Sequence, residues 1–596
     1  MATVAATPTS KISGGSFLIE ERTPDEIFTP EDFTDQHRLI AQTAEEFANK
    51  EIVPNMERME HKDLAAHREL LKKAGELGLS GVDIPEQYGG MELDKVTSAI
   101  IADRIAKYGG FSTTWGAHTC IGTLPIVYFG TEEQKKKYLP GLASGETVGA
   151  YALSESSSGS DALNCRAKAT LSADGKHYLL NGEKMWITNA GFADLFIVFA
   201  KVDGEKFTAF IVERKFAGFA VGAEEHKMGI RGSSTCPLIL TDCKVPVENV
   251  LGEIGKGHHI AFNVLNVGRF KLGAGCVGGA RSSIESAVAY AKQRKAFGKV
   301  IADFGLVREK IANMAVGIFT GEAMAYRTVG MMDAAIAQLA DHNDMVQVRK
   351  VIDEYAIECS ILKVWGSEFI NSVVDETVQI YGGYGFVEEY PAERAYRDAR
   401  INRIFEGTNE INRLVITGFL LKRAMSGQLP LMAAIKKLMD EVLSGTKEEG
   451  TDGLLAEERR LVATAKKVGL FAAGVATQKY MMGLQDQQEI MGAIANMTID
   501  TYAMESAVLR AQKLAAKTIE SNAAHAIAMT RVYMTGAMER VESSARAVIA
   551  ASAEGDMLRS QMAILRRLCK YEPFNTIALR EKVAQKVIES GKYVVA

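Results

Sequence analysis

The feature that most constrains the fold of this chain is a change of residue periodicity, from helical to strand-like and back. Before residue 150, apolar residues recur every three to four positions, as in HRLIAQTAEEFANKEIVP, and this spacing predicts amphipathic helices. Residues 150–255 instead contain short runs rich in β-branched and aromatic residues, separated by turns such as Asp174-Gly175 and Asp203-Gly204. Residues 256–425 return to long helical patterns. We therefore expect a mainly α protein with a central antiparallel β domain.

The length of the chain requires several domains, because 596 residues exceed what one hydrophobic core supports. The polar stretches SGQLP (Ser426–Pro430) and SGTKEEGTDG (Ser444–Gly453) are typical of linkers, and helical patterns continue after them. The predicted units are an N-terminal tail at 1–34, a helical domain at 35–149, the β domain at 150–255, a second helical domain at 256–425 and a C-terminal helical extension at 426–596.

The composition argues against several classes of function. The net charge of −5, from 69 basic and 74 acidic residues, argues against nucleic acid as a partner. Seven scattered cysteines without a CxxC pair indicate a reducing compartment and no metal site. No apolar run reaches the roughly 18 residues of a transmembrane helix. The first residues lack the apolar core of a signal peptide, so we expect a flexible tail rather than a transit peptide.

One glycine motif, GAGCVG at Gly273–Gly278, matches the dinucleotide-binding pattern GxGxxG. That pattern functions between a strand and a helix of a βαβ unit, whereas the sequence is helical on both sides of this one. We therefore expect these small residues to let helices pack closely.

A more informative acid lies in RIFEGTNEIN, where Glu406 stands between Phe405 and Gly407. An aromatic neighbour can exclude water, and a glycine lets a ligand approach the backbone. This setting suits a catalytic acid or base better than a surface carboxylate.

Four further segments could bind a ligand, although each also fits an ordinary structural role. YALSESSSGSD could offer hydroxyl and backbone donors to a ligand, or it could be an ordinary polar turn. KMWITNA places an aromatic and a hydroxyl residue two positions apart on one face of a strand, where they could meet a cofactor; alternatively, the tryptophan is half-buried in a hairpin. RKAFG contains an arginine that could bind phosphate, and QIYGGYGF contains paired glycines that allow a ligand close to the backbone. Either segment could instead be a solvated helix end or a loop. None of these segments alone decides between the two interpretations, and for KMWITNA the spacing alone favours the hairpin.

Taken in order, these segments resemble the acyl-CoA dehydrogenase family from about residue 35 to about residue 420. The extra helical domain, with GAHTCIG and LNVGRF, is similar to the very-long-chain branch of that family. The resemblance implies a helical domain, an antiparallel β domain and a four-helix bundle, followed by the C-terminal helical extension.

The resemblance implies an FAD-dependent α,β-dehydrogenation of long-chain acyl-CoA to trans-2-enoyl-CoA, the first step of fatty acid β-oxidation. Glu406 would be the catalytic base, with a pKa raised by burial, and electrons would pass to an electron-transfer flavoprotein. The implied FAD contacts are Tyr151, Leu153, Ser154, Gly159, Ser160, Trp186, Thr188, Arg294, Phe297, Gln379, Gly382, Gly383, Thr408 and Asn409. The implied substrate contacts are Ser160, Arg269, Phe405, Gly407, Gly116 and Gly122.

Two details of this assignment depend on a few residues each. Arg294 and Phe297 would reach the FAD of a neighbouring subunit, although Ala296 replaces a threonine that is usual in the family motif. Gly116 and Gly122 would leave space at the blind end of an acyl tunnel, and close helix packing is the alternative.

The extension would cover the surface through which family tetramers pair their dimers, so we expect a homodimer. A cytoplasmic, bacterial location is favoured over the mitochondrial matrix, with membrane association at most peripheral. Two other functions remain open: an acyl-CoA oxidase that uses oxygen, which reoxidation in air would distinguish, and a flavoprotein assembly factor of the same fold, which turnover with an artificial acceptor would exclude.

Overall fold

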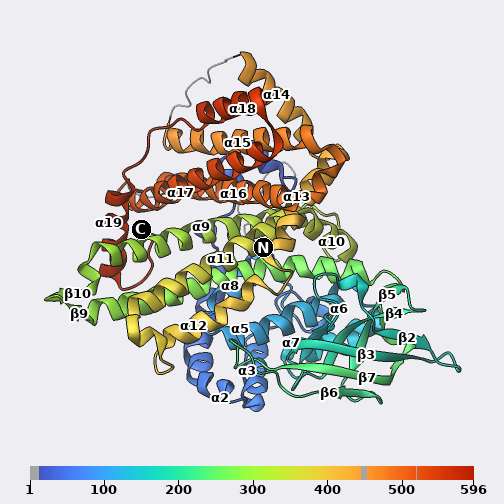
Figure 1. Ribbon diagram of the computed structural model, residues 1–596. Coiled ribbons are helices and arrows are strands. Elements are labelled where there is room, and N and C mark those ends of the chain that lie inside the picture. Colours follow the sequence, from blue (N-terminus) through green and yellow to red (C-terminus); the bar gives the residue numbers. More distant parts are fainter. Residues whose placement is uncertain (1–11, 445–452, 518–519, 596) are drawn as a thin grey trace.

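The computed structural model describes residues 12–444, 453–517 and 520–595. It confirms a mainly helical protein with a central sheet domain (Figure 1). The long helices α8, α9 and α11 cross the middle of the molecule. The C-terminal helices cover one side of them, and the sheet and the N-terminal helices lie on the other. The predicted linker at Ser444–Gly453 lies almost wholly outside the described residues.

The N-terminal helical domain begins at well-defined caps. The hydroxyl of Thr34 and the carboxylate of Asp94 accept hydrogen bonds from the first turns of α1 and α4, which satisfies otherwise unpaired N–H groups. α5 continues into a π-helical segment, η7 (Ala117–Gly122), beside the sheet. The helices are α1 (Asp35–Phe47), α2 (Met56–Glu60), α3 (Leu64–Glu76), α4 (Lys95–Arg104), α5 (Gly109–Gly116), α6 (Leu124–Phe129) and α7 (Glu132–Ser144).

The β domain forms one sheet in the order β6-β7-β3-β2-β4-β5-β8, with β1 also paired to β4. Both predicted Asp-Gly turns join antiparallel neighbours, β2 to β3 and β4 to β5. In the second turn both Asp203 and Gly204 have positive φ, as tight hairpins require. The strands are β1 (Gly149–Ala152), β2 (Lys168–Leu171), β3 (His177–Thr188), β4 (Leu195–Val202), β5 (Lys206–Glu213), β6 (Phe219–Val221), β7 (Thr235–Pro246) and β8 (Val250–Leu251).

Two strand pairings differ from the antiparallel expectation, because β4 runs parallel to both β1 and β2. Turn chemistry reveals hairpins between consecutive strands. A parallel pair needs a longer connection, and no local signal predicts it.

The second helical domain is built on α8, whose 37 residues extend over roughly 55 Å at 1.5 Å per residue. The GAGCVG motif lies inside α8, and its glycines face other helices: a Cβ at Gly273 would lie 3.0 Å from Leu362 Cβ, and one at Gly278 only 1.9 Å from Asp103 O. The close-packing interpretation is confirmed. The elements are α8 (Gly257–Gln293), β9 (Lys295–Ala296), β10 (Lys299–Val300), α9 (Gly305–Ile336), α10 (Met345–Glu354), α11 (Ala356–Tyr381), α12 (Pro391–Ala399) and α13 (Asn409–Met425).

The C-terminal extension packs on α9 and α13 through α16. Buried ion pairs cross this boundary, with Arg327 Nη2 2.6 Å from Glu505 Oε2 and Arg510 Nη1 2.8 Å from Glu322 Oε2. The helices are α14 (Leu431–Ser444), α15 (Ala456–Tyr480), α16 (Gln488–Lys517), α17 (Glu520–Ser552), α18 (Gly555–Leu568) and α19 (Thr576–Ser590). Across the described ranges, every helix is too short or too polar to span a lipid bilayer.

The predicted N-terminal tail is wrong for residues 12–34. The amide of Gly15 donates to Glu358 Oε1 at 2.7 Å, and Glu31 pairs with Arg510 at 2.9 Å. Lys513 Nζ donates to the carbonyl of Ile27 at 2.6 Å. The segment contains only three short 3₁₀ helices, η1 (Ser16–Leu18), η2 (Pro24–Glu26) and η3 (Pro30–Asp32), which are too short to give a periodic sequence pattern. Its order therefore comes from partners more than 340 residues away along the chain.

Candidate active site

Glu406 lies in a short loop between η12 (Arg400–Arg403) and α13. Glu406 and Gly407 have φ values of 58° and 82°, so both adopt left-handed backbone. For a residue other than glycine this conformation costs on the order of 1–3 kcal/mol, and such strain concentrates at functional sites. The backbone therefore marks the same residue that the sequence motif singled out.

Polar side chains hold the carbonyl groups of this loop from behind. Asn412 Nδ2 donates to the carbonyl oxygens of Glu406, Gly407 and Thr408 at 3.3, 2.8 and 3.0 Å. Arg269 Nε donates to the Glu406 carbonyl at 3.3 Å. The amide N–H of Glu406 has no acceptor among the described residues. The loop thus leaves an unused donor beside the carboxylate.

The Glu406 carboxylate has the properties of a general base. Its Oε2 atom is buried and has no hydrogen-bond partner within the described part of the chain. Burial raises the pKa of Glu406 to about 7, and the cations of Arg269 and Lys363 oppose this rise. A carboxyl group that titrates near 7 can accept a proton at neutral pH.

A cavity of about 490 Å³ begins at Glu406 and Phe405. α8 lines it from Gly268 to Ser286, over roughly 27 Å at 1.5 Å per residue. Near the base its wall is largely apolar. This part of the wall includes Cys120, whose thiol lies within reach of the Glu406 charge, and Leu272, one helical turn beyond Gly268 on α8.

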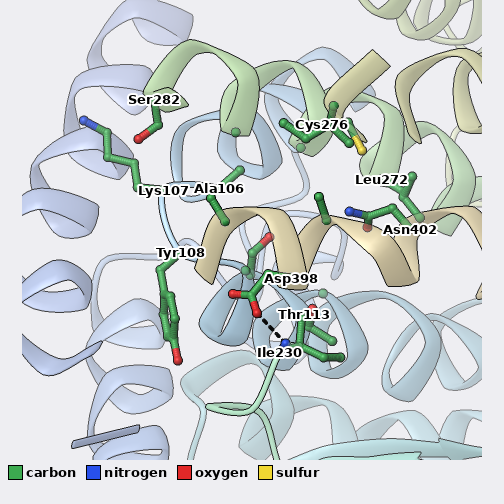
Figure 2. Close-up of a pocket in the computed structure, with 18 of the residues that line it drawn as sticks. Ala106, Lys107, Tyr108, Thr113, Ile230, Leu272, Cys276, Ser282, Asp398 and Asn402 are labelled. Atoms are coloured by element: carbon green, nitrogen blue, oxygen red, sulfur yellow. Dashed lines mark hydrogen bonds between the residues drawn. The ribbon is translucent and has the colours of Figure 1, made fainter. Parts of the chain in front are cut away.

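Figure 2 shows polar lining residues, among them Lys107, Tyr108, Ser282, Asp398 and Asn402, beside apolar ones such as Ala106, Leu272 and Cys276. The Asp398 carboxylate accepts a hydrogen bond from the amide of Ile230. Burial raises the pKa of Asp398 to about 7. The cavity wall therefore combines apolar and polar side chains.

The two glycines predicted to end the tunnel have different surroundings. Gly116 lines the cavity, and a Cβ there would meet no atom within 4 Å. A Cβ at Gly122 would lie 2.7 Å from the backbone carbon of Gly149 in β1. Gly122 is absent from the cavity wall, so close packing between η7 and β1 explains it, and its assignment to the tunnel is corrected.

The predicted flavin loop and the KMWITNA strand lie together. Lys184 Nζ donates to the Leu153 carbonyl at 3.1 Å, and the Met185 amide to the Ser154 carbonyl at 3.0 Å. The Tyr151 hydroxyl is buried with no partner among the described residues, and its pKa is raised by burial and by the charge of Glu406.

Nearby, Trp186 is 57% exposed in left-handed backbone, and Thr188 lines the cavity. Ile187 between them is buried, so both face away from the core, as the spacing predicted. At Gly159 a Cβ would meet nothing within 4 Å, and Ser160 is exposed. An unpaired buried hydroxyl beside an exposed aromatic ring and an open turn can accept a flat ring with polar edges.

Five other predicted flavin contacts, which are Arg294, Phe297, Gln379, Gly382 and Gly383, lie at the other end of α8 and α11. The Arg294 guanidinium is 5.6 Å from the centre of the Tyr384 ring, next to Gly382 and Gly383, and Phe297 is 94% exposed. Gln379 is in the last turn of α11. Arg294 is 26 residues beyond Gly268 along the chain, roughly 39 Å at the helical rise. Within one chain, these residues therefore lie far from Glu406.

In four predicted contacts, the side chain or the backbone conformation already has a role within the protein. Arg269 is buried and bonded to Asn266 and the Glu406 carbonyl, so it supports the base loop instead of facing a substrate. Asn409 is buried and bonded to Lys363, Ser367 and Glu368, so its side chain is not directed to a cofactor. Gly407 is required by its φ of 82°, and Thr408 caps α13 through the amide of Ile411.

Sequence reasoning missed Gly268, Lys363 and Asn412. Gly268 lies in LNVGRF, where nothing in the sequence gives it a role, although a Cβ there would lie 2.7 Å from Glu406 Oε2. Lys363 and Asn412 lie on helices whose patterns signal only amphipathic packing. A lysine inside the apolar run SILKVW was the available sequence signal for Lys363.

The fold and the site define an enzyme in which a carboxylate base faces an enclosed, partly apolar cavity. Family models described as the N-terminal, middle and C-terminal domains of acyl-CoA dehydrogenases match residues 34–146, 150–243 and 255–421. A second model, also described as an acyl-CoA dehydrogenase C-terminal domain, matches residues 464–567.

A probable acyl-CoA dehydrogenase of Bacillus subtilis is 50% identical over 584 residues, covering 98% of both chains. The human mitochondrial very long-chain specific acyl-CoA dehydrogenase is 38% identical over 466 residues, covering 74% of this chain and 69% of the relative. A crystal structure of an acyl-CoA dehydrogenase complexed with FAD from Bacillus anthracis superimposes with a TM-score of 0.97 at 51% identity, covering 98% of this chain and 100% of the other. The chain belongs to the acyl-CoA dehydrogenase family.

Proposed function

We propose that the protein oxidises long-chain acyl-CoA thioesters to trans-2-enoyl-CoA with FAD as its cofactor. The observation that carries this proposal is the Glu406 carboxylate, which is strained, unpaired and titrates near 7 at the head of a cavity of about 490 Å³. The family of the chain supports the reaction, and the FAD complex of the Bacillus anthracis relative supports the cofactor.

The residues around the base fit a proton abstraction next to a thioester. Glu406 removes the proton from the α-carbon, and the free N–H of Glu406 donates to the thioester oxygen as negative charge develops there. The apolar wall near the base excludes water, which strengthens both interactions. FAD supplies the acceptor for the hydride that leaves the β-carbon.

The residues present fit a flavin. The ring would lie against Trp186 and Thr188, with the unpaired Tyr151 hydroxyl near it and the open turn at Gly159 and Ser160 beyond. Arg294, Phe297, Gln379, Gly382 and Gly383 are too far along α8 and α11 to complete the same site. We therefore propose that they hold the other end of FAD in a second copy of the chain, within a homodimer.

The length of the cavity supports a long acyl chain. Each further methylene that it buries would contribute up to about 0.8 kcal/mol to binding. The very long-chain relative at 38% identity is consistent with this substrate class. An electron-transfer flavoprotein as acceptor and a cytoplasmic location stay predictions of the sequence.

Turnover of hexadecanoyl-CoA with an artificial electron acceptor tests the proposal. The wild-type protein should bleach its flavin absorbance on adding substrate without oxygen. Glu406→Gln, nearly isosteric but unable to accept the proton, should keep its flavin and lose at least about 100-fold in rate. A Glu406→Gln rate within a few-fold of wild type would contradict the assignment of the base. Rapid reoxidation of the reduced protein in air would instead identify an oxidase.

A further inference from the structure

We propose that Lys363 is a positioning residue for this reaction: from inside α11 it holds the loop of Glu406 through the Gly407 carbonyl and the Asn409 side chain, and it presents its positive charge to the base. This inference rests on the proposed function of Glu406. It adds a residue that neither a sequence motif nor a ligand contact indicates.

Lys363 bonds two groups of the base loop from inside the protein. Its side chain is fully buried, and Nζ lies 2.6 Å from the Gly407 carbonyl oxygen and 2.7 Å from Asn409 Oδ1. Asn409 in turn exchanges hydrogen bonds with Ser367, which lies one helical turn beyond Lys363 on α11. Asn409, the residue that ends the loop, is therefore fixed to the face of α11 that carries Lys363 and Ser367.

The loop needs such support because two successive residues have left-handed backbone. Strain of this kind persists only where surrounding contacts outweigh it. Asn412 already donates to the Gly407 carbonyl at 2.8 Å, and Lys363 adds a charge-assisted bond to the same oxygen. With that carbonyl held inside the protein, the Glu406 side chain and its N–H remain available at the cavity.

Burying a lysine here costs free energy that a purely structural role does not explain. Among the described residues, no carboxylate oxygen lies within 4 Å of Lys363 Nζ, so its charge has no direct ion pair. A buried cation without a partner is costly, and a neutral donor could hold a carbonyl at lower cost. The charge is explained if it acts on the base beside it.

The electrostatic surroundings support this explanation. Burial lowers the pKa of Lys363 to about 8, and the negative charge of Glu406 opposes that decrease. Lys363 and Arg269 in turn oppose the rise in the pKa of Glu406. The titratable and charged groups that face either residue are Arg269, Glu410, Cys276, Cys120 and Tyr151.

Lys363→Met removes both the charge and the donors at similar length, and Lys363→Arg keeps the charge. Lys513→Met is the matched control, because Lys513 is also buried and also donates to a backbone carbonyl, that of Ile27, and to a carboxylate, that of Asp32. It lies in the C-terminal extension, away from the base loop. Thermal unfolding and flavin content are measured for all variants.

Two readouts test the charge and the positioning separately. Infrared titration of the Glu406 carboxyl band, assigned with Glu406→Gln, reports its protonation without any turnover. In Lys363→Met this titration should move to higher pH, and the rate constant kcat on hexadecanoyl-CoA should fall at least tenfold with a smaller change in KM. Lys363→Arg should recover part of both effects, and Lys513→Met should change only the unfolding temperature.

An unshifted infrared titration in Lys363→Met overturns the proposal, whether or not the protein acts on acyl-CoA, because the band is read in the absence of substrate. A lower unfolding temperature with unchanged kcat also overturns it and leaves Lys363 a purely structural role. Lys363→Gln serves as a second neutral variant if the methionine variant does not fold. Failure of wild-type turnover alone would contradict the proposed function and not the effect of Lys363 on Glu406.

Discussion

The Glu406 carboxylate occupies the space that a side chain at residue 268 would fill: a Cβ at Gly268 would lie 2.7 Å from Glu406 Oε2 and 2.9 Å from its Cδ. The two residues are 138 positions apart and meet where α8 passes the base loop. Glycine at 268 therefore sets how close the base lies to α8 and to the head of the cavity.

Gly268→Ala is expected to lower kcat at least tenfold while leaving the protein folded. The added methyl group displaces the carboxylate, whereas alanine in a helix favours folding by up to about 1 kcal/mol over glycine. Steady-state kinetics and thermal unfolding measure the two effects. Gly418→Ala in α13 is the control, since a Cβ there would meet no atom within 4 Å. Unchanged kcat in Gly268→Ala would show that the base tolerates displacement.

The activity should rise with pH through about 7, because Glu406 accepts a proton only when ionised and burial raises its pKa to about 7. The pH dependence of kcat/KM measures the ionisation of the free enzyme. A profile that is flat from pH 5 to 8 would contradict a base with this pKa.

The same shift predicts a stability difference. The folded pKa of about 7 lies above the ordinary value of 4.5, so the unfolded chain loses this proton first and the folded state loses stability as pH rises between the two values. Wild type should therefore lose at most about 3 kcal/mol relative to Glu406→Gln over this range. Denaturant unfolding of both proteins at pH 5 and pH 8 measures it; a constant difference would rule out the raised pKa.

Gly116→Leu should reduce activity on long acyl-CoAs more than on short ones. The side chain has room to enter the cavity, and each methylene of substrate that it displaces loses up to about 0.8 kcal/mol. Turnover across acyl-CoAs of increasing length tests this. Gly122→Ala offers a contrast, because its methyl group meets the Gly149 backbone and should lower stability without changing chain-length preference. Equal loss on all chain lengths in Gly116→Leu would favour a packing role for Gly116.

Arg294→Ala should weaken flavin retention and dimer association together, since the proposed contact crosses between subunits and a charge-assisted bond to phosphate is lost. Light scattering and flavin absorbance on one sample measure both. Lys292→Ala, an exposed cation two residues earlier, should change neither. Full flavin occupancy in a monomer would contradict the shared site.

The sequence by itself determined the features that depend on neighbours along the chain. The helical periods before 150 and after 255, and the hairpins at Asp203-Gly204 and Asp174-Gly175, follow from side-chain spacing and turn chemistry. The Phe-Glu-Gly motif suggested a catalytic role for Glu406, and the resemblance to the family implied that this role is the base.

Only the tertiary structure decided which distant groups meet. It placed Gly268 and Lys363 against the base loop, used Asn409 as an internal anchor, and separated Gly116 on the cavity from Gly122 against β1. It also ordered residues 12–34 through Arg510 and Lys513, and paired β4 in parallel with β1 and β2. The periodicity of a helix or strand predicts which of its faces is buried, but the residues that pack against that face depend on the folding of the whole chain.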